Sequence, residues 1–390
     1  MEILTPDITT IKEIQPKTKT MQFFDNEVVE FLDELSKTLL KTKQIRELPE
    51  LVAVGFWLRK TNIMRLKKRF FQKNSGVLLL PRGVVFHIAP TNVDTLFLYS
   101  LVLALLSGNT NILRISSKTT QQTQLLLDIF IQLLKRYKVV HRHIYLVRYA
   151  HDDAITSELS MLCDVRVLWG GDATIQHIRS IPIPPTAIEL NFADKFSFAV
   201  FRLRQDVVDE LFLEKFYRDS FTFLQNACSS VRSVCWIDTP KELQEDFWKK
   251  FVHYVAKKQP ELEAKHTSDK LLSQTVLAIE NKVQIKNSGV VSRVLFNSIE
   301  ELTKQHHCGY GLFYELELDS LEEFFSHCDK KVQSVVLEGF LKTELEEVLQ
   351  TVRPQGVDRV VKLGQASEFS ATWDGFDILS SLCRIVNVAV

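Results

Sequence analysis

GVVFHIAPTNVDTLFLYSLVLALLSGNTNILRISSK, the sequence of residues 83–118, decides the fold of this chain. Its apolar runs at 84–88 and 111–115 predict two buried β-strands, because turn residues bound each run. The eleven residues at 96–106 are nearly all apolar and predict a helix inside a globular domain, since a bilayer span needs roughly 20 residues. A strand, a helix and a second strand in this order build a parallel sheet. The stretch therefore predicts an α/β fold.

The same alternation continues along the chain. Apolar residues three and four positions apart predict helices across 23–71. Beyond the opening stretch, the sequence predicts helices at 119–137, 173–180, 206–224 and 240–256 and strands at 143–147, 165–169, 187–191, 196–201 and 231–237. A chain of 390 residues normally forms two domains, and we expect two here.

Composition and charge are those of an ordinary globular protein. The 48 basic residues balance 48 acidic ones, so no global field favours nucleic acid or an anionic membrane as a partner. The polar, acidic first fifteen residues lack the features of a secretory signal, which predicts a cytoplasmic protein. The six cysteines show no metal-ligand spacing, so no metal site is expected.

Two junctions between predicted elements can carry chemistry. Gly170 and Gly171 follow a strand and precede a helix, where backbone N–H groups can approach a phosphate. Cys228 lies in QNACSS (225–230) between a helix and a strand, where an exposed thiol can act as a nucleophile. The alternative is an ordinary role for each: steric freedom for the glycines, and for the thiol a buried apolar position, which we expect for Cys235.

The opening stretch resembles the cofactor-domain signature of the aldehyde dehydrogenase superfamily. In that signature a strand ends in a Pro-x-Asn turn, and after a helix Gly-Asn-Thr leads into a strand ending on a basic residue. The matching residues are Pro90, Asn92, 108–110 and Arg114. The resemblance implies a Rossmann-type cofactor domain and an α/β catalytic domain, with Cys228 as nucleophile and Asn92 as oxyanion donor. It also implies cofactor contacts from Pro90, Thr91, Arg114, Ser116, Ser117, Lys118, Gly170, Gly171 and Asp172.

The segment IELNFADK (188–195) departs from the Glu-Leu-Gly-Gly-Lys motif that carries the general base of the hydrolytic members. Matching Glu-Leu places Glu189 at the base position, whereas matching the lysine to Lys195 places Asn191 there. The second frame continues better into the following strand. Under it the deacylating base is missing, which suits a reductase that does not use water.

Most of the chain resembles the long-chain acyl-CoA reductases, the family related to the fatty acid reductase of bacterial bioluminescence. The resemblance is carried by FWLRKTNI (56–63), GVVFHIAPTNV (83–93), WGGDATI (169–175), DKFSFAV (194–200), QNACSS (225–230) and GVDRVVKLGQASEFSATWDGFDIL (356–379). It implies reduction of a fatty acyl-CoA or other acyl thioester to the fatty aldehyde through an acyl-cysteine. Val231 departs from the family, since a proline is common there.

The resemblance also indicates the cofactor and the partners. NAD-preferring members carry a glutamate three residues after the basic residue, but here Ser117 stands beside Arg114 and Lys118, which favours NADPH. We expect an acyl-CoA or acyl-protein substrate, a homo-oligomer, and an acyl-protein synthetase or a thioesterase as candidate partners. Two alternatives stay open: an acyl transferase or thioesterase that uses the same cysteine, and an inactive scaffold with the same fold.

The resemblance predicts four segments along the chain. Residues 1–75 form an N-terminal helical segment on the cofactor domain, and 76–192 form the Rossmann-like NAD(P)-binding domain. Residues 193–355 form the catalytic domain with the nucleophilic cysteine. Residues 356–390 form a C-terminal segment that returns to the core or to an oligomer interface.

Overall fold

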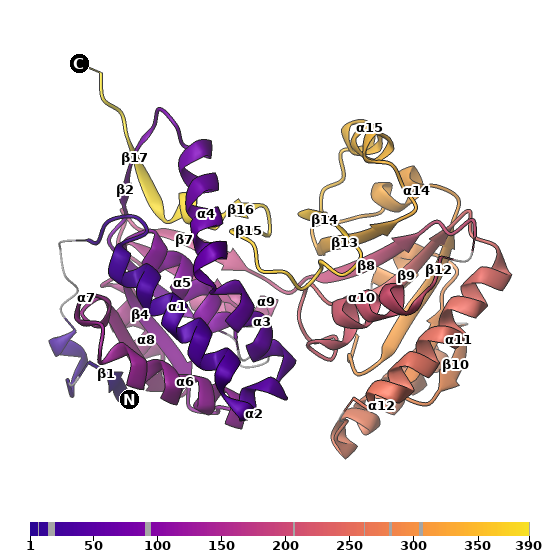
Figure 1. Cartoon of the computed structure of the whole chain (residues 1–390), viewed down its shortest axis with the longest axis horizontal. Coiled ribbons are helices and arrows are strands. Elements are labelled where there is room, and N and C mark those ends of the chain that lie inside the picture. The colour runs from indigo at the N-terminus through magenta and orange to yellow at the C-terminus, as the bar shows by residue number, and fades with distance from the viewer. Residues whose placement is uncertain are drawn as a thin grey trace. The chain divides into compact units, whose positions relative to one another are not determined.

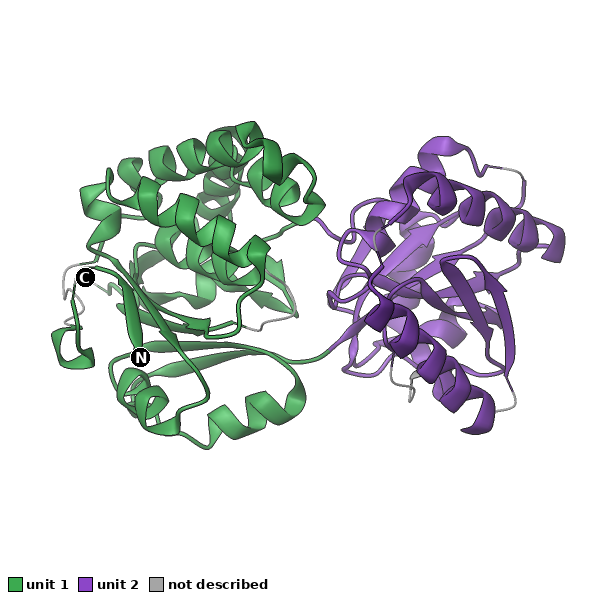
Figure 2. Cartoon of the chain, turned by 90° about the horizontal axis from the view of Figure 1, so that it is seen from below, with its two compact units in different colours: residues 1–194, 369–390 green, residues 195–368 purple. Residues whose placement is uncertain are grey.

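The computed structural model describes residues 1–6, 8–14, 20–89, 95–205, 207–260, 262–280, 283–303 and 307–389. It divides into two compact units (Figure 2): unit 1 comprises residues 1–194 and 369–390, and unit 2 comprises residues 195–368. The first division falls just beyond the boundary expected at 192. The chain returns to unit 1 at Phe369, later than the residue 356 expected from the sequence.

A six-stranded sheet forms the centre of unit 1. Its strands lie in the order β1-β5-β4-β3-β6-β7, and neighbouring strands are parallel except β1 with β5. These strands are β1 (Glu2–Thr5), β3 (Val84–Ile88), β4 (Thr110–Ser116), β5 (Ile144–Tyr149), β6 (Val165–Trp169) and β7 (Ile188–Phe192). The opening stretch forms β3, α5 (Leu96–Leu106) and β4, which confirms the predicted strand-helix-strand unit.

Helices cover both faces of this sheet (Figure 1). One face, with Leu113 and Val167, packs against α1 (Asn26–Lys41), α5 and α6 (Gln121–Leu134); the other, with Phe86 and Tyr145, packs against α8 (Asp153–Ser160) and α9 (Asp172–Arg179). Both faces are buried, which is why the strands are continuous apolar runs. Unit 1 also contains η1 (Ile11–Glu13), α2 (Lys43–Arg46), α3 (Pro49–Trp57), α4 (Lys60–Lys73) and α7 (Lys138–His141).

An aromatic cluster packs the C-terminal segment, which begins at Phe369, against the rest of unit 1. The ring centroids of Phe369 and Trp373 lie 5.5 and 5.7 Å from that of Tyr99 on α5, and Phe369 also lies 5.2 Å from Trp57. The segment then forms β15 (Thr372–Trp373), β16 (Phe376–Asp377) and α16 (Ile378–Ser381). Aromatic pairs of this kind add about 0.5–1.5 kcal/mol each to burial, which accounts for the return of the chain at Phe369.

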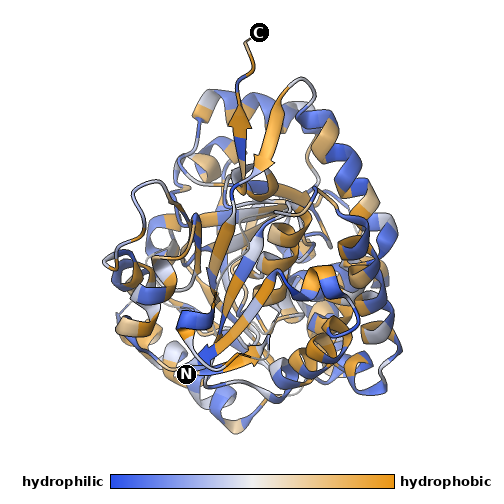
Figure 3. Cartoon of the chain, turned by 90° about the vertical axis from the view of Figure 1, so that its left-hand side faces the viewer, coloured by the Kyte–Doolittle hydropathy of each residue, from blue (hydrophilic) through white to orange (hydrophobic). Residues whose placement is uncertain are grey.

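The last strand forms a separate ribbon on unit 1. β17 (Cys383–Val386) pairs with β2 (Leu78–Pro81) in an antiparallel two-stranded sheet. Figure 3 shows both strands as largely hydrophobic, and Leu78 and Ile385 are 49% and 72% exposed. A two-stranded ribbon with exposed apolar side chains is normally covered by another surface.

His87 lies fully buried at the centre of the unit 1 sheet. Its Nε2 lies 3.0 Å from Asn111 Oδ1, and its Nδ1 lies 2.7 Å from Ser100 Oγ, which also accepts the indole N–H of Trp169 at 3.3 Å. Since Asn111 Oδ1 only accepts, the proton is on Nε2 and Ser100 donates to Nδ1. Burial lowers the pKa of His87 from 6.5 to about 4, so the ring is neutral in the folded protein at neutral pH.

Acid is expected to destabilise unit 1 through His87. The unfolded chain takes up a proton near pH 6.5 and the folded chain only near pH 4, so this stability is present above pH 6.5 and is lost as the pH falls to about 4. Between pH 7.5 and pH 5 the loss is about 2 kcal/mol. Urea unfolding of wild type and His87→Gln at both pH values measures it, and an equal pH dependence in the two proteins would contradict the assignment.

A seven-stranded sheet forms the centre of unit 2. The order is β10-β11-β12-β9-β8-β13-β14, and neighbouring strands are parallel except β10 with β11. These strands are β8 (Phe196–Phe201), β9 (Val231–Ile237), β10 (Gln284–Ser288), β11 (Val291–Leu295), β12 (Leu312–Leu318), β13 (Val332–Glu338) and β14 (Arg359–Lys362). The strand predicted at 231–237 is confirmed at both ends.

Helices also pack on both faces of the unit 2 sheet. α10 (Glu210–Phe221) and α11 (Lys241–Lys258) cover one face, and α12 (Ala264–Glu280), α13 (Ile299–Thr303), α14 (Leu321–Ser326) and α15 (Lys342–Val352) contribute to the core on the other. α10 is shorter than the predicted 206–224, because Asp209 caps it by accepting the N–H of Phe212. No helix among the described residues combines the length and the apolar character that a membrane span requires.

Two polar contacts keep residues 356–368 in unit 2. Lys195 immediately precedes β8, and its Nζ lies 2.5 Å from Asp358 Oδ2; both side chains are largely buried. The carboxylate of Asp219 on α10 accepts the N–H groups of Gly364 and Ala366 at 2.5 and 2.9 Å. The tail motif is thus an internal part of unit 2 up to residue 368, rather than a separate C-terminal segment from 356 onward.

Candidate active site

The strand order of unit 1 defines where a ligand would bind. From β3 the chain extends the sheet first through β4 and β5 and then, on the other side, through β6 and β7, so the order reverses between β3 and β6. Open α/β sheets bind ligands at the carboxyl ends of the strands next to such a reversal. Pro90, Thr91 and Asn92 follow β3 and lie outside the described residues. Gly170 and Gly171 follow β6 and lie at the reversal.

Neither the backbone conformation nor the local packing requires a glycine at position 170 or 171, the two positions after β6. Both have negative φ, a Cβ on Gly171 would meet no atom within 4 Å, and a Cβ on Gly170 would touch Thr174 at an ordinary 3.5 Å. α9 begins directly afterwards at Asp172, with Gly171 as its N-cap and no side-chain cap. Gly171 is exposed, and none of the described residues fills the space beside it, which suits a phosphate-binding turn.

Arg114 lies near the carboxyl end of β4. Its guanidinium lies 4.9 Å from the ring centroid of Tyr149, and its buried Nε has no hydrogen-bond partner among the described residues. Ser116 ends the strand and accepts the N–H of Lys118 at 3.1 Å, and Ser117 and Lys118 are exposed. A buried guanidinium with an unpaired donor, followed by an exposed serine and lysine, is a suitable surface for an anionic ligand.

Glu189 is held in ion pairs on the α8/α9 face of the sheet. Its carboxylate lies 2.5 Å from Nη2 of the buried Arg166 and 3.1 Å from Nε of Arg179. Arg166 also donates to the carbonyl of Ile181 and to Ser160. Glu189 pairs in register with Arg166, the second residue of β6, which places it toward the amino end of these strands. A carboxylate bound by two arginines is poorly suited to take a proton from water.

Asn191 lies nearer the carboxyl ends of the strands than Glu189. It pairs in register with Leu168, and its Nδ2 donates to Glu189 at 3.2 Å, while its buried Oδ1 has no partner among the described residues. An amide cannot accept a proton as a general base does.

Cys228 lies at the amino edge of the unit 2 sheet, in the connection from α10 to β9. The N–H of Ser230 donates to the carbonyl of Ala227 at 2.9 Å, so residues 227–230 form a tight turn with Cys228 at its second position. Cys228 is partly exposed. This is the position that the sequence predicted, at the exposed end of a helix-to-strand junction.

The other five cysteines are less suited to nucleophilic chemistry. Four are buried, and burial raises the pKa of Cys163 and of Cys383 to about 12 and raises the pKa values of Cys235 and Cys328. Cys235 packs in the core, as predicted. Cys308 is partly exposed, but burial raises its thiol pKa as well. Cys228 is therefore the best candidate nucleophile of the six.

Gln225 fixes the start of the Cys228 turn. It is fully buried with φ +62, its Oε1 accepts the N–H of Gly311 at 2.8 Å, and its Nε2 donates to the carbonyls of Val231 and Leu312 at 3.1 and 3.0 Å. A non-glycine residue with positive φ persists only where its surroundings hold it. The sequence analysis placed Gln225 in the nucleophile motif. Its hydrogen bonds to residues 311–312 join distant parts of the sequence, so its role in fixing the turn could not be predicted from the motif.

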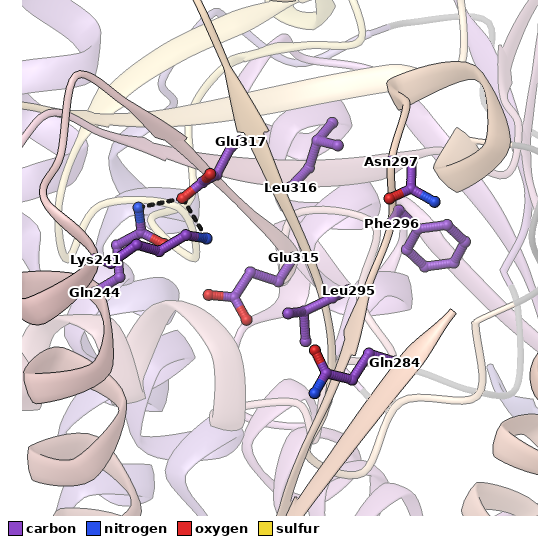
Figure 4. A pocket seen from close by; sticks show the side chains of 9 residues that line it. All are labelled: Lys241, Gln244, Gln284, Leu295, Phe296, Asn297, Glu315, Leu316 and Glu317. Carbon is purple, nitrogen blue, oxygen red and sulfur yellow. Dashed lines mark hydrogen bonds and ion pairs between the residues drawn. The ribbon is translucent and has the colours of Figure 1, made fainter. Parts of the chain in front are cut away.

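A separate hollow of about 370 Å³ lies at the opposite, carboxyl edge of the unit 2 sheet. In Figure 4 the side chains of Lys241 and Gln244 converge on Glu317, each 2.5 Å from its Oε1. Glu315 accepts from the indoles of Trp236 and Trp248 and pairs with Arg293. The three charged residues in its lining are thus already partnered, and the length of β9 separates the hollow from Cys228.

The fold of this chain is that of the aldehyde dehydrogenases. Solved structures with this fold include a NAD-dependent benzaldehyde dehydrogenase from Corynebacterium glutamicum, at TM-score 0.65 and 13% identity over 92% of this chain and 84% of that chain. PnpE from Pseudomonas sp. WBC-3 matches at TM-score 0.66 and 14% identity, over 93% and 86% of the two chains. The NADP-dependent glyceraldehyde-3-phosphate dehydrogenase of Bacillus halodurans C-125, complexed with NADP, matches at TM-score 0.64 and 14% identity, over 93% and 86%. At such identities the similarity shows the fold alone.

The family is narrower than the fold. The family model "Acyl-CoA reductase (LuxC)" matches residues 19–385, so the chain belongs to the acyl-CoA reductase (LuxC) family and is an oxidoreductase of acyl groups. A search of curated protein sequences finds no match. The family match covers the motifs that carried the resemblance in the sequence.

Proposed function

We propose that this protein reduces a long-chain fatty acyl-CoA to the fatty aldehyde, with NADPH as the reductant and Cys228 as the nucleophile. The observation that carries the proposal is the partly exposed Cys228 on a turn whose start is fixed by the buried side chain of Gln225, in a chain of the acyl-CoA reductase family. The acyl-CoA substrate, the chain length class and the choice of NADPH are inferences from the family and from the residues below.

The chain's own residues account for acyl transfer. The Cys228 thiolate attacks the thioester carbonyl, a new C–S bond forms, and the bond to CoA breaks so that CoA leaves as its thiolate. Asn92 and the backbone N–H of Cys228 are proposed to hold the oxyanion of each tetrahedral intermediate, and a donor of this kind contributes about 3–4 kcal/mol. Bound NADPH supplies the hydride that reduces the acyl group. Collapse of the resulting thiohemiacetal releases the aldehyde and regenerates the Cys228 thiolate.

The residues at the carboxyl edge of the unit 1 sheet fit a dinucleotide. Among the described residues, the buried Nε of Arg114 has no hydrogen-bond partner, and no atom lies within 4 Å of the position that a Cβ of Gly171 would take. Ser117 and Lys118 are exposed beside them. A related fold is known with NADP and another with NAD, which supports a nicotinamide cofactor here. We assign cofactor binding to these residues, to Ser116 and Asp172, and to Pro90 and Thr91.

Ser117→Glu is expected to shift the cofactor preference from NADPH toward NADH. A carboxylate at this exposed position repels the 2′-phosphate of NADPH and can accept from the ribose 2′-OH of NADH. The ratio of kcat/KM for NADPH to that for NADH should fall by about 10- to 100-fold, since a repulsion of 1.4–2.8 kcal/mol corresponds to that factor. Equal catalytic efficiency of the wild-type protein with both cofactors would contradict the proposed preference.

Reduction of the acyl-cysteine, the second step of the proposed reaction, does not need a general base that activates water. Glu189 is bound to Arg166 and Arg179, and Asn191 cannot accept a proton, so neither residue is suited to activate water against an acyl-cysteine. This supports a reductase over a thioesterase. Incubation with acyl-CoA separates the two and also tests the proposal: a reductase oxidises one NADPH per CoA released and forms an aldehyde, whereas a transferase or thioesterase releases CoA without oxidising NADPH.

We further propose a homo-oligomer in the cytoplasm. Ile385 on β17 is 72% exposed, and Leu271, Leu272 and Ile279 on α12 are 65%, 64% and 79% exposed. Apolar side chains that gather on one surface often mark a contact with another protein chain. None of the six cysteines, all of which the structure describes, forms a disulfide, which suits a reducing compartment. We also propose an acyl-protein as an alternative substrate. An acyl-protein synthetase or a thioesterase is the proposed partner that would supply the acyl group.

A further inference from the structure

A buried hydroxyl holds the main chain of Cys228. Ser197, the second residue of β8, is fully buried, and its Oγ donates to the carbonyl oxygen of Cys228 at 2.7 Å. The Ser197 Oγ in turn accepts the backbone N–H of Ser334 on β13 at 3.2 Å. The Ser197 hydroxyl has a single proton to donate. Because the N–H of Ser334 supplies the proton in one of its two hydrogen bonds, the hydroxyl proton is donated to the Cys228 carbonyl.

The strands around Ser197 are irregular on both sides. β9 places an extra residue opposite β8, since Ser197 pairs with Val231 and Phe198 with Ser233. β13 shifts in the same region, between Val332 and Val335. Bulges of this kind interrupt ladder hydrogen bonds and re-aim nearby residues, often beside active sites. The Ser197 hydroxyl accepts an N–H of β13 within the shifted region and connects it to the Cys228 turn.

Holding a carbonyl fixes the residue that carries it. The Cys228 carbonyl lies in the peptide plane that leads to Ser229, so a fixed carbonyl limits rotation about the bond from the Cys228 Cα to its carbonyl carbon. Gln225 fixes the start of the same turn, three residues earlier, through its contacts with Val231 and 311–312. Together the two side chains leave the thiol-bearing residue little freedom to change its direction.

The structure assigns Ser197 as a positioning residue that aims the Cys228 thiol at the acyl carbonyl. This inference rests on the proposed function of Cys228 as the nucleophile. Ser197 does not touch the reacting atoms, since its contacts are with main-chain groups. It acts by keeping the turn in the conformation from which attack occurs, and small misplacements of a reacting group cost up to about 100-fold in rate.

Ser197→Ala tests the assignment, with Ser334→Ala as its matched control. The Ser334 side chain is also fully buried, but its Oγ has no partner among the described residues, so its removal deletes a similar hydroxyl without touching Cys228. Single-turnover release of CoA from acyl-CoA, without NADPH, reports acyl transfer per folded molecule. We expect the maximal rate to fall about 10- to 100-fold in Ser197→Ala, with an unchanged acyl-CoA concentration for half-maximal rate, and to stay within about twofold in Ser334→Ala.

Amide hydrogen exchange of residues 226–230 provides a second readout that needs no substrate. Exchange should be faster in Ser197→Ala, because the turn loses one anchor, and unchanged in Ser334→Ala. Unchanged exchange together with a wild-type rate of acyl transfer in Ser197→Ala would overturn the assignment, as would equal losses in the two variants. If wild type forms no acyl-Cys228, the proposed function fails, while the exchange comparison still decides whether Ser197 holds the turn.

Discussion

Replacing Cys228 by serine is expected to lower the rate of NADPH oxidation with acyl-CoA by at least about 10⁴-fold. A hydroxyl is far less nucleophilic than a thiolate, because its pKa is much higher and it stays protonated at neutral pH. Binding of acyl-CoA and of NADPH should change little, because the substitution replaces one atom. Steady-state oxidation of NADPH and titration of both ligands measure the two effects separately.

Cys308→Ser is the control for this loss. Cys308 is the other partly exposed cysteine, so it resembles Cys228 in exposure, but it does not lie in the 227–230 turn. Its variant should retain wild-type activity within about threefold, as expected for a substitution outside the reacting groups. A fully active Cys228→Ser protein, or an inactive Cys308→Ser protein, would show that the nucleophile has been assigned to the wrong residue.

Arg166→Met is expected to destabilise unit 1 by about 3–5 kcal/mol, because it leaves the mostly buried Glu189 carboxylate without its main partner. Arg179 is largely exposed and cannot replace the buried contact. Arg166 also donates to the carbonyl of Ile181, which would lose its hydrogen bond. Chemical unfolding followed by the fluorescence of Trp57, Trp169 and Trp373 in unit 1 reports the loss.

A double variant separates the buried charge from the rest of the effect. In Arg166→Met/Glu189→Leu neither charge remains, so the double variant should be more stable than Arg166→Met alone. Glu189→Gln, which keeps the shape of the side chain, should retain reductase activity because Glu189 acts in the structure and not as a base. Loss of reductase activity in a folded Glu189→Gln protein would contradict that role.

The fold was largely predictable because its signals are local. The strand at 84–88 and the helix at 96–106 are continuous apolar runs between turn residues, and both are buried in the structure as predicted. Parallel strands covered on both faces have such runs, so periodicity and turn residues were sufficient. The point at which the chain returns to unit 1 was predicted at 356 but lies at Phe369. Contacts of Asp219 and Lys195 keep residues 356–368 in unit 2, and these contacts could not be predicted because each joins residues more than 140 positions apart in the sequence.

The site was predictable only where a motif carries it. Cys228 and the glycines after β6 stand in motifs at element junctions, and the structure places them at such junctions. The pairing of Glu189 with Arg166 had no sequence signal, because adjacent strands bring these residues together from separate segments. Ser197 likewise looks like any polar residue at the start of a strand, and its role depends on irregular pairing with two neighbouring strands.

The acyl-cysteine is the central claim, and intact-protein mass spectrometry after incubation with a long-chain acyl-CoA in the absence of NADPH tests it most directly. Without the reductant the proposed intermediate should accumulate, because neither Glu189 nor Asn191 is suited to activate water. We predict a mass increase of one acyl group, located by peptide mapping on the peptide that contains Cys228 and lost on addition of NADPH with release of the aldehyde. An unmodified protein that nevertheless reduces acyl-CoA, or an acyl group on any other residue, would contradict the account.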